Sequence, residues 1–322
     1  MRSWDGGSLG SQAKAINDAG VIVGYASEPS PSRYEAGVAY AARWVRTTQG
    51  SWQVTRLGAP GGRALALNER GDVVGTRNGT ALVWPATGNE VSLIGGGVAE
   101  GINTARVIVG GSTWNNDSRA IAWTPDAGSD PTTWSSHYLP PLPNGTLSHA
   151  FAISEGGVIV GSAASAAGRW QAVIWAPAAN GEWSSPVALS GTEASLGQSG
   201  GFAINAGGDV GGYYSSCSGC SIHAYFWPAG GGSPTDLAML NSPTSSGHAR
   251  GIENGRRVVG FISVPLSSGV GLFLWAPGNA ALTDLGTGEA NDINNRSARY
   301  GQEVVGFSYG PKGSQATVWR VP

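Results

Sequence analysis

Lysine, charge in general and long apolar runs are all scarce in this chain of 322 residues. Lysine occurs only at Lys14 and Lys312, charged residues make up 12% of the chain, and the formal net charge is −2. Such sparse charge without a basic cluster argues against a nucleic-acid binder. No apolar run approaches the ~18 residues of a membrane span, and residues 1–10 lack the apolar stretch of a signal peptide. We therefore expect no nucleic-acid partner and no membrane span.

Cysteine is scarce as well, with only Cys217 and Cys220 present. In an oxidising compartment this pair predicts a small loop disulfide, and in a reducing one a redox or metal pair. A zinc site needs about four ligands, and only His223 lies close in sequence. The disulfide is the favoured interpretation, and we expect no metal and no cofactor. Because Ser, Gly, Thr and Asn dominate over Lys and Glu, we also expect a secreted or extracellular protein whose signal peptide has been removed.

Glycine and tryptophan, by contrast, are abundant, and both recur periodically along the chain. A phrase of a small residue, an aliphatic residue, usually Asn, a turn and a Val-rich run closes on Gly24, Gly75, Gly110, Gly161, Gly212, Gly260 and Gly306. A second phrase follows each copy and ends on Trp44, Trp84, Trp123, Trp175, Trp227, Trp275 and Trp319. The closing glycines are 35 to 51 residues apart, which is typical of a propeller or solenoid.

Each repeat predicts four strands of a propeller blade. The first phrase is a hairpin whose Asn and Gly are explained by its turn, the Trp phrase is a third strand, and a weaker fourth strand ends in Leu. The seventh repeat has three strands, and residues 1–10 resemble a fourth. We predict an all-β, seven-bladed propeller of four-stranded blades, closed by the N-terminal strand completing the last blade. The blades of this single domain, 1–322, are expected at about 11–58, 61–95, 97–142, 147–190, 199–238, 247–286, and 289–322 plus 1–10.

The repeated hairpin, followed by a His-Ala-Phe-like strand that ends in Trp, resembles the bacterial extracellular HAF-repeat family. The His-Ala element stands at His149–Phe151 and at His223–Phe226, and repeat phrases cover essentially the whole chain. The resemblance implies an exported repeat protein and brings no catalytic motif. Ser154 and Glu253 replace the repeated Asn in two copies, so we do not expect that Asn to be a shared ligand.

Candidate binding residues lie on the loops of one face, where propellers usually carry their function. With the first strand innermost, one set surrounds the channel: Gln12, Lys14, Arg63, Glu100, His149, His248, Arg250 and Glu289. The loops between second and third strands add Arg119, Trp170, Gln171, His223 and Gln315. Trp114 and Trp170 fall outside the repeat register, and an aromatic side chain among polar ones suits stacking on a sugar ring. Wet propeller loops also collect polar residues without any ligand.

The favoured function is that of a non-enzymatic, monomeric binding module for a carbohydrate or surface polymer, reached through this loop face. No nucleophile elbow, zinc-protease motif, Walker loop or dinucleotide fingerprint appears. One alternative is a carbohydrate-active enzyme, a polysaccharide lyase or glycoside hydrolase, with an acid and a base over the channel. The other is a passive protein-interaction scaffold.

Overall fold

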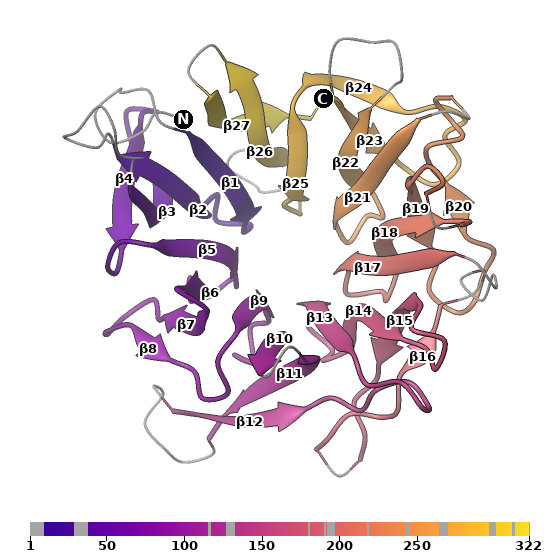
Figure 1. The fold of residues 1–322 in the computed structure, drawn as a ribbon. Helices are drawn as coiled ribbons and strands as arrows, with labels where there is room; N and C mark the ends of the chain where they lie inside the picture. Colours follow the sequence, from indigo (N-terminus) through magenta and orange to yellow (C-terminus); the bar gives the residue numbers. More distant parts are fainter. Residues whose placement is uncertain are drawn as a thin grey trace.

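The computed structural model describes residues 10–28, 38–114, 117–126, 133–179, 181–189, 191, 197–217, 219–242, 245–263, 270–295, 301–310 and 313–321. These residues form seven antiparallel sheets, six of four strands and one of three. Figure 1 shows the sheets arranged as blades of a ring, with the first strand of each blade at the centre. The chain is therefore an all-β, seven-bladed propeller, as predicted. Within the described residues no helix is long and apolar enough to cross a membrane.

The inner two strands of each blade form a hairpin. The first strands are β1 (Ser11–Ile16), β5 (Gly62–Leu67), β9 (Val98–Ile102), β13 (Ser148–Ile153), β17 (Gln198–Ile204), β21 (Ser246–Ile252) and β25 (Glu289–Ile293). The second strands are β2 (Ile22–Glu28), β6 (Val73–Arg77), β10 (Ile108–Trp114), β14 (Ile159–Ala164), β18 (Val210–Ser215), β22 (Val258–Ser263) and β26 (Glu303–Gly310).

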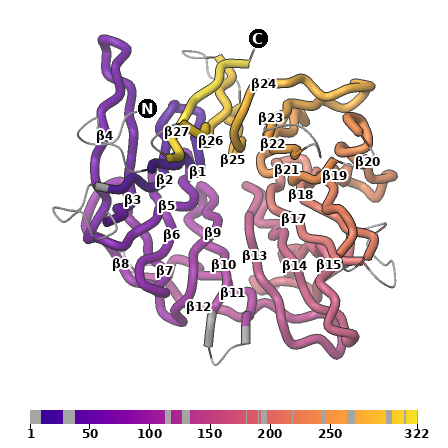
Figure 2. Tube along the Cα trace, turned by 45° about the horizontal axis from the view of Figure 1, so that its top comes forward, coloured from indigo at the N-terminus to yellow at the C-terminus, as the bar shows by residue number. Residues whose placement is uncertain are grey.

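The outer two strands follow in sequence order. The third strands are β3 (Val38–Arg46), β7 (Thr80–Trp84), β11 (Asp117–Pro125), β15 (Trp170–Trp175), β19 (His223–Trp227), β23 (Val270–Trp275) and β27 (Gly313–Arg320). The fourth strands are β4 (Trp52–Leu57), β8 (Val91–Ser92), β12 (Trp134–Tyr138), β16 (Val187–Ala188), β20 (Thr235–Asp236) and β24 (Thr283–Thr287). The hairpin of β3 and β4 extends beyond the rest of the ring in Figure 2. The fourth strand predicted for the last blade falls on residues 1–9, which lie outside the described residues.

The repeated tryptophans pack between blades. Trp44, Trp123 and Trp175 have no exposed surface, and each of the seven clusters of buried apolar residues spans two neighbouring blades and holds one repeat Trp. Large aromatic side chains bury the most area per residue, so one Trp per interface supplies much of the attraction between blades. The repeat tryptophans are therefore inter-blade anchors.

The ring closes where the last blade meets the first. The cluster around Trp44 includes Val305 and Ala316 of the seventh blade. In the same interface, Arg46 forms an ion pair with the fully buried Glu303, and the Ala316 N–H donates a hydrogen bond to Ser11 Oγ (3.0 Å). The described strands alone therefore hold the two ends of the array together.

The repeated Asn side chain does more than stabilise its own turn. Its Oδ1 accepts a hydrogen bond from a backbone N–H four residues later, at 2.9–3.0 Å, in Asn17, Asn68, Asn103 and Asn205. Its Nδ2 donates to the backbone carbonyl of the equivalent residue in the next blade, at 3.0–3.3 Å. Ser154 and Glu253 keep the turn hydrogen bond but form no inter-blade one to a described residue. The Asn thus joins neighbouring blades, which the turn pattern alone did not predict.

Every inner strand carries a β-bulge at the same position. The pairing register between first and second strands shifts by one residue in all seven blades. The bulge also explains the closing glycine of each repeat, because a Cβ there would overlap a backbone carbonyl of the bulged strand. In the fourth blade, for example, the His149 carbonyl lies against Gly161. Bulges redirect side chains, and here they set what faces the channel.

Candidate functional site

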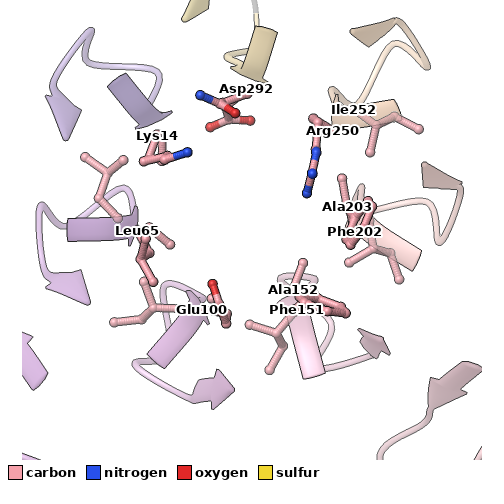
Figure 3. A pocket seen from close by; sticks show the side chains of 18 residues that line it. Lys14, Leu65, Glu100, Phe151, Ala152, Phe202, Ala203, Arg250, Ile252 and Asp292 are labelled. Atoms are coloured by element: carbon pink, nitrogen blue, oxygen red, sulfur yellow. The ribbon is translucent and has the colours of Figure 1, made fainter. Parts of the chain in front are cut away.

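The residue at the bulge occupies the centre of the propeller in every blade. Between small neighbours, this position varies freely along the chain. The seven bulge residues are Lys14, Leu65, Glu100, Phe151, Phe202, Arg250 and Asn291. All of them line a cavity of about 300 Å³ in the channel, and Figure 3 shows most of them around its open centre. The repeat thus builds a constant frame that presents seven variable side chains to one space.

One side of this cavity is aromatic. We call the aromatic wall the chain of ring contacts that runs across the fourth to sixth blades: His149, Phe151, Phe202, Tyr213, His248 and Phe261. Successive ring centroids lie 4.6–5.5 Å apart, within the range of favourable aromatic pairs. Phe151 and Phe202 belong to the cavity lining itself, so this wall offers apolar surface to a ligand.

His248 is a neutral member of the aromatic wall. Burial, with a further contribution from the positive charge of Arg250, lowers the pKa of His248 to about 4. Its ring lies nearly parallel to those of Phe202 and Tyr213, and its buried Nδ1 has no hydrogen-bond partner among the described residues. An uncharged imidazole stacked in this way acts as an aromatic surface rather than as a proton donor at neutral pH.

Two cations project into the same cavity. The Arg250 guanidinium lies 4.2 Å from the Phe202 ring centroid, and Lys14 Nζ lies about 6 Å from the rings of Tyr25 (6.0 Å) and Phe307 (5.9 Å). Burial lowers the pKa of both side chains, and the charge of Arg250 lowers that of Lys14 further. These cation–π contacts stabilise the cations, and neither cation donates a hydrogen bond to a described residue.

Two carboxylates at the channel have other side chains as their nearest polar neighbours. Glu100 Oε1 lies 3.5 Å from His149 Nε2, and Glu289 Oε1 accepts a hydrogen bond from the Tyr309 hydroxyl (2.8 Å). Both carboxylates raise the pKa of Lys14 and of Arg250, but neither is within ion-pair distance of those cations in the described chain. The cavity therefore presents two cations and an aromatic face, with no carboxylate of the described chain within ion-pair distance of either cation.

Asp292 is the acid that the sequence analysis missed. It follows the bulge of the last blade, where the other six blades have Ala or Gly. Its Oδ2 accepts a hydrogen bond from the Ile16 N–H (3.0 Å), and its Oδ1 accepts one from the Ile293 N–H (2.9 Å). Burial raises the pKa of Asp292 to about 7, against the lowering effect of these two hydrogen bonds. A perturbed carboxyl in a cavity is a feature of functional sites.

The turn end of the channel is separate in character. A smaller cavity of about 150 Å³ lies there and shares Ile153, Ile204, Ile252 and Asp292 with the larger one. Its carboxylates are engaged between blades, as where the Asp18 N–H donates to Glu69 (3.0 Å). Within the described residues, no group of three or more His, Cys, Asp or Glu side chains could hold a metal ion.

The predicted site residues divide into two groups. Arg63, Glu100, His149, His248, Arg250 and Glu289 lie on inner strands around the channel. Arg119, Trp170 and His223 lie on the third strands β11, β15 and β19 and do not line the described channel cavities. The structure thus does not bring the two groups into one pocket.

The outer group has local contacts. Arg119 is exposed, with its guanidinium 5.9 Å from the Tyr138 ring, and His223 Nδ1 lies 2.7 Å from Asp236 Oδ2. Trp170 is half-buried at the start of β15. Trp114 ends β10, and its side chain lies outside the described residues.

Phe151 and Phe202 are cavity residues that the sequence analysis did not select. A signal for them exists, because they occupy the same variable position, between two small residues, as the selected Glu100 and Arg250. The same position in all seven repeats marks the whole set of bulge residues.

The two cysteines form a disulfide, as predicted. Cys217 and Cys220 are bonded, with their Cα atoms 5.2 Å apart. The bridge lies in the loop between β18 and β19, outside the channel, and closes a very short loop. It therefore restrains one surface loop rather than the propeller as a whole.

No family model and no curated protein matches this chain, so the resemblance to the HAF-repeat family stays a prediction. Among solved structures, an acylaminoacyl peptidase in complex with Z-Gly-Gly-Phe-chloromethyl ketone is similar, with a TM-score of 0.55 and 12% identity over 97% of this chain and 51% of the peptidase. The Pyrococcus horikoshii acylaminoacyl peptidase is similar with a TM-score of 0.51 and 12% identity, over 97% of this chain and 50% of the peptidase. This chain spans about half the length of either. At such identity the likeness shows the propeller fold alone.

Proposed function

We propose that this protein is a binding module that takes a carbohydrate into the central channel. The observation that carries the proposal is the cavity of about 300 Å³, where Phe151 and Phe202 face Lys14 and Arg250. Its volume is at the lower end of small-molecule pockets, which suits one or two sugar rings. The C–H face of a sugar can pack on an aromatic ring, while its hydroxyls accept hydrogen bonds from the cations.

The proposed binding site lies near the propeller axis and not on the outer loop face that the sequence analysis favours. The inner residues Glu100 and Arg250 belong to the cavity, whereas Trp170 does not. A surface polymer would place a terminal unit in the channel and extend over the loop face, where Trp170 would contact only the extended chain. Binding of a monosaccharide and binding of a polymer should therefore respond differently to the two sites.

The test is a glycan panel followed by calorimetry on wild type and Phe202→Ala. Because the variant removes a ring from the cavity wall, affinity for the bound sugar should fall by about 10-fold or more. The matched control is Tyr138→Ala, which removes an exposed ring (52% exposed) from the outer strand β12 and should leave affinity unchanged. Equal affinity of Phe202→Ala and wild type would refute the channel as the site. A loss in Trp170→Ala restricted to polymers would support the extended contact.

Export from the cell is part of the same proposal. The Cys217–Cys220 disulfide supports it, because such bonds persist in oxidising compartments and are rare in the cytosol. Mass spectrometry of alkylated protein taken directly from the native cells and their medium tests it. Recovery of the oxidised pair from the medium is expected, and free thiols in a cytosolic fraction would contradict it.

One observation favours a carbohydrate-active enzyme as a second candidate. Asp292, with its pKa raised to about 7, is suited to donate or accept a proton at neutral pH, and Glu100 lines the same cavity. Release of unsaturated or reducing-end products from a polysaccharide panel, abolished by Asp292→Asn, would favour this candidate. Glycan binding without product release would favour the binding module over the enzyme. If no glycan binds and none is cleaved, the result would favour a passive protein-interaction scaffold.

A further inference from the structure

Lys14 and Arg250 are cations without an anionic partner among the residues that the structure describes. They lie on the first and sixth blades, on either side of the seventh, and both side chains point into the central cavity (Figure 3). Neither forms a hydrogen bond or ion pair with any residue that the structure describes. Two half-buried arginines elsewhere in the described chain do have an acidic partner: Arg46 pairs with Glu303, and Arg106 Nε lies 3.2 Å from Asp72 Oδ2.

Two like charges held together without a partner are unfavourable. Burial removes hydration from each cation, and their mutual repulsion adds to that cost. Burial lowers the pKa of both side chains, and the charge of Arg250 lowers that of Lys14 further. Glu100 and Glu289 offset this cost only in part: both raise the pKa of the two cations, but neither lies within ion-pair distance of them in the described chain. An anion placed between the two cations would relieve their repulsion.

The shape of the site restricts which anion fits. Arg250 stacks on Phe202 with its guanidinium 4.2 Å from the ring centroid, so the guanidinium is held in place and its N–H edge remains open. A planar carboxylate can accept two parallel hydrogen bonds from such an edge. The rest of the ligand would then lie against Phe151 and Phe202, which line the same cavity.

We propose that Lys14 and Arg250 form a carboxylate site in the channel, and that the bound sugar is a uronic acid. The sugar part of this inference rests on the function proposed above, whereas the carboxylate site does not. Arg250 fixes the carboxylate plane, Lys14 adds a second positive charge, and the ring of the ligand packs on the aromatic wall.

The experiment separates the two parts with paired probes. D-glucuronate and D-galacturonate are each compared with the corresponding neutral hexose, and benzoate is compared with benzyl alcohol, by calorimetry. Wild type should prefer each acid by about 10-fold or more, the effect of a charge-assisted hydrogen bond. Arg250→Gln and, independently, Lys14→Gln should reduce that preference by a similar factor. Arg169→Gln makes the same change in the loop between β14 and β15 and should have no effect.

Each outcome decides one or both proposals. Acid preference in both probe pairs, lost in the two channel variants alone, supports the inference. Preference for benzoate without binding of any sugar keeps the carboxylate site and refutes the carbohydrate function. If sugars bind equally well with and without a carboxylate, and Arg250→Gln and Lys14→Gln do not change their affinity, the carboxylate site is refuted. The proposed carbohydrate binding then still stands. Failure of every probe to bind refutes both. Thermal unfolding of each variant identifies a loss of folding, and either channel variant suffices if the other fails to fold.

Discussion

Replacing Asp292 by Asn should make the stability of this propeller less dependent on pH. Burial raises the pKa of Asp292 from 3.8 to about 7. Between these two values the unfolded chain has lost a proton that the folded protein keeps, so the folded state is favoured less as pH rises. The contribution of this group to stability is therefore fully present below about pH 4 and is lost as pH rises to about 7.

The size of the effect follows from the pKa difference. About 3 pH units correspond to about 4 kcal/mol, at about 1.4 kcal/mol per unit. Asp292 keeps part of its surface open to the channel, and water there reduces the figure, so we expect about 2–4 kcal/mol. Asn has no proton to lose, and the unfolding free energy of the variant minus that of wild type should grow by this amount from pH 4 to pH 8.

A constant offset accompanies this growth. The two Asp292 oxygens accept N–H groups of Ile16 and Ile293, whereas an Asn side chain has one acceptor oxygen. Loss of one such hydrogen bond costs about 1–2 kcal/mol at every pH. Asp292→Ala, which restores the small residue of the other blades, should show the same growth with pH and a different offset.

Urea unfolding between pH 4 and pH 8, followed by tryptophan fluorescence, measures the difference directly. Titrations elsewhere in the chain affect wild type and variants alike and cancel in the comparison. A difference in unfolding free energy that stays constant within about 0.5 kcal/mol across this range would refute the reasoning. It would mean that Asp292 ionises in the folded protein much as it does in the unfolded chain.

Asn68→Ala should lower the unfolding free energy by about 2–4 kcal/mol, because four hydrogen bonds of a buried side chain are lost. Asn68→Ser should lose less, because a serine hydroxyl can keep the turn hydrogen bond as Ser154 does, and equal urea midpoints for the two variants would contradict a contribution of that turn bond. Gly161→Ala should lower the unfolding free energy by about 3 kcal/mol, because its Cβ would overlap the backbone carbonyl of the bulged strand. Gly156→Ala, whose Cβ would have its nearest neighbour at 3.8 Å, should leave the melting temperature nearly unchanged. Similar melting temperatures for the two variants would argue against the close approach at Gly161. Cys217→Ser should cost about 2 kcal/mol or less, because the disulfide closes a very short loop, and complete unfolding of this variant at 25 °C would show a larger role for the bridge.

Much of the fold could be predicted because a propeller repeats its local rules. Each hairpin, Trp strand and turn is specified by residues close together in sequence, and seven copies make the pattern unmistakable. Each repeat Trp lies at or near the end of a third strand, as its spacing predicts, and the structure shows that it packs between blades. The disulfide likewise required only two cysteines a few residues apart.

The site was predicted only in part, since its residues come from seven separate repeats. Arg250 and Glu100 were selected as polar residues near the axis, but Phe202 resembled an ordinary strand residue. A bulge, which shows only in the pairing of two strands, turns that position towards the channel. Trp170 is the opposite case. Its irregular place in the repeat suggested a binding role, but it does not line the cavity.

The sequence by itself determined the number of blades, their strand order and the recurrence of one Trp strand per blade, because these depend on periodicity and on local turn and strand preferences. Only the tertiary structure decided that one variable position in each repeat forms a common cavity, and that Asn side chains join successive blades. Ring closure brings together residues hundreds of positions apart, as in the hydrogen bond between Ile16 and Asp292. Burial, unpaired charge and a raised pKa arise from that proximity, and no single repeat contains them.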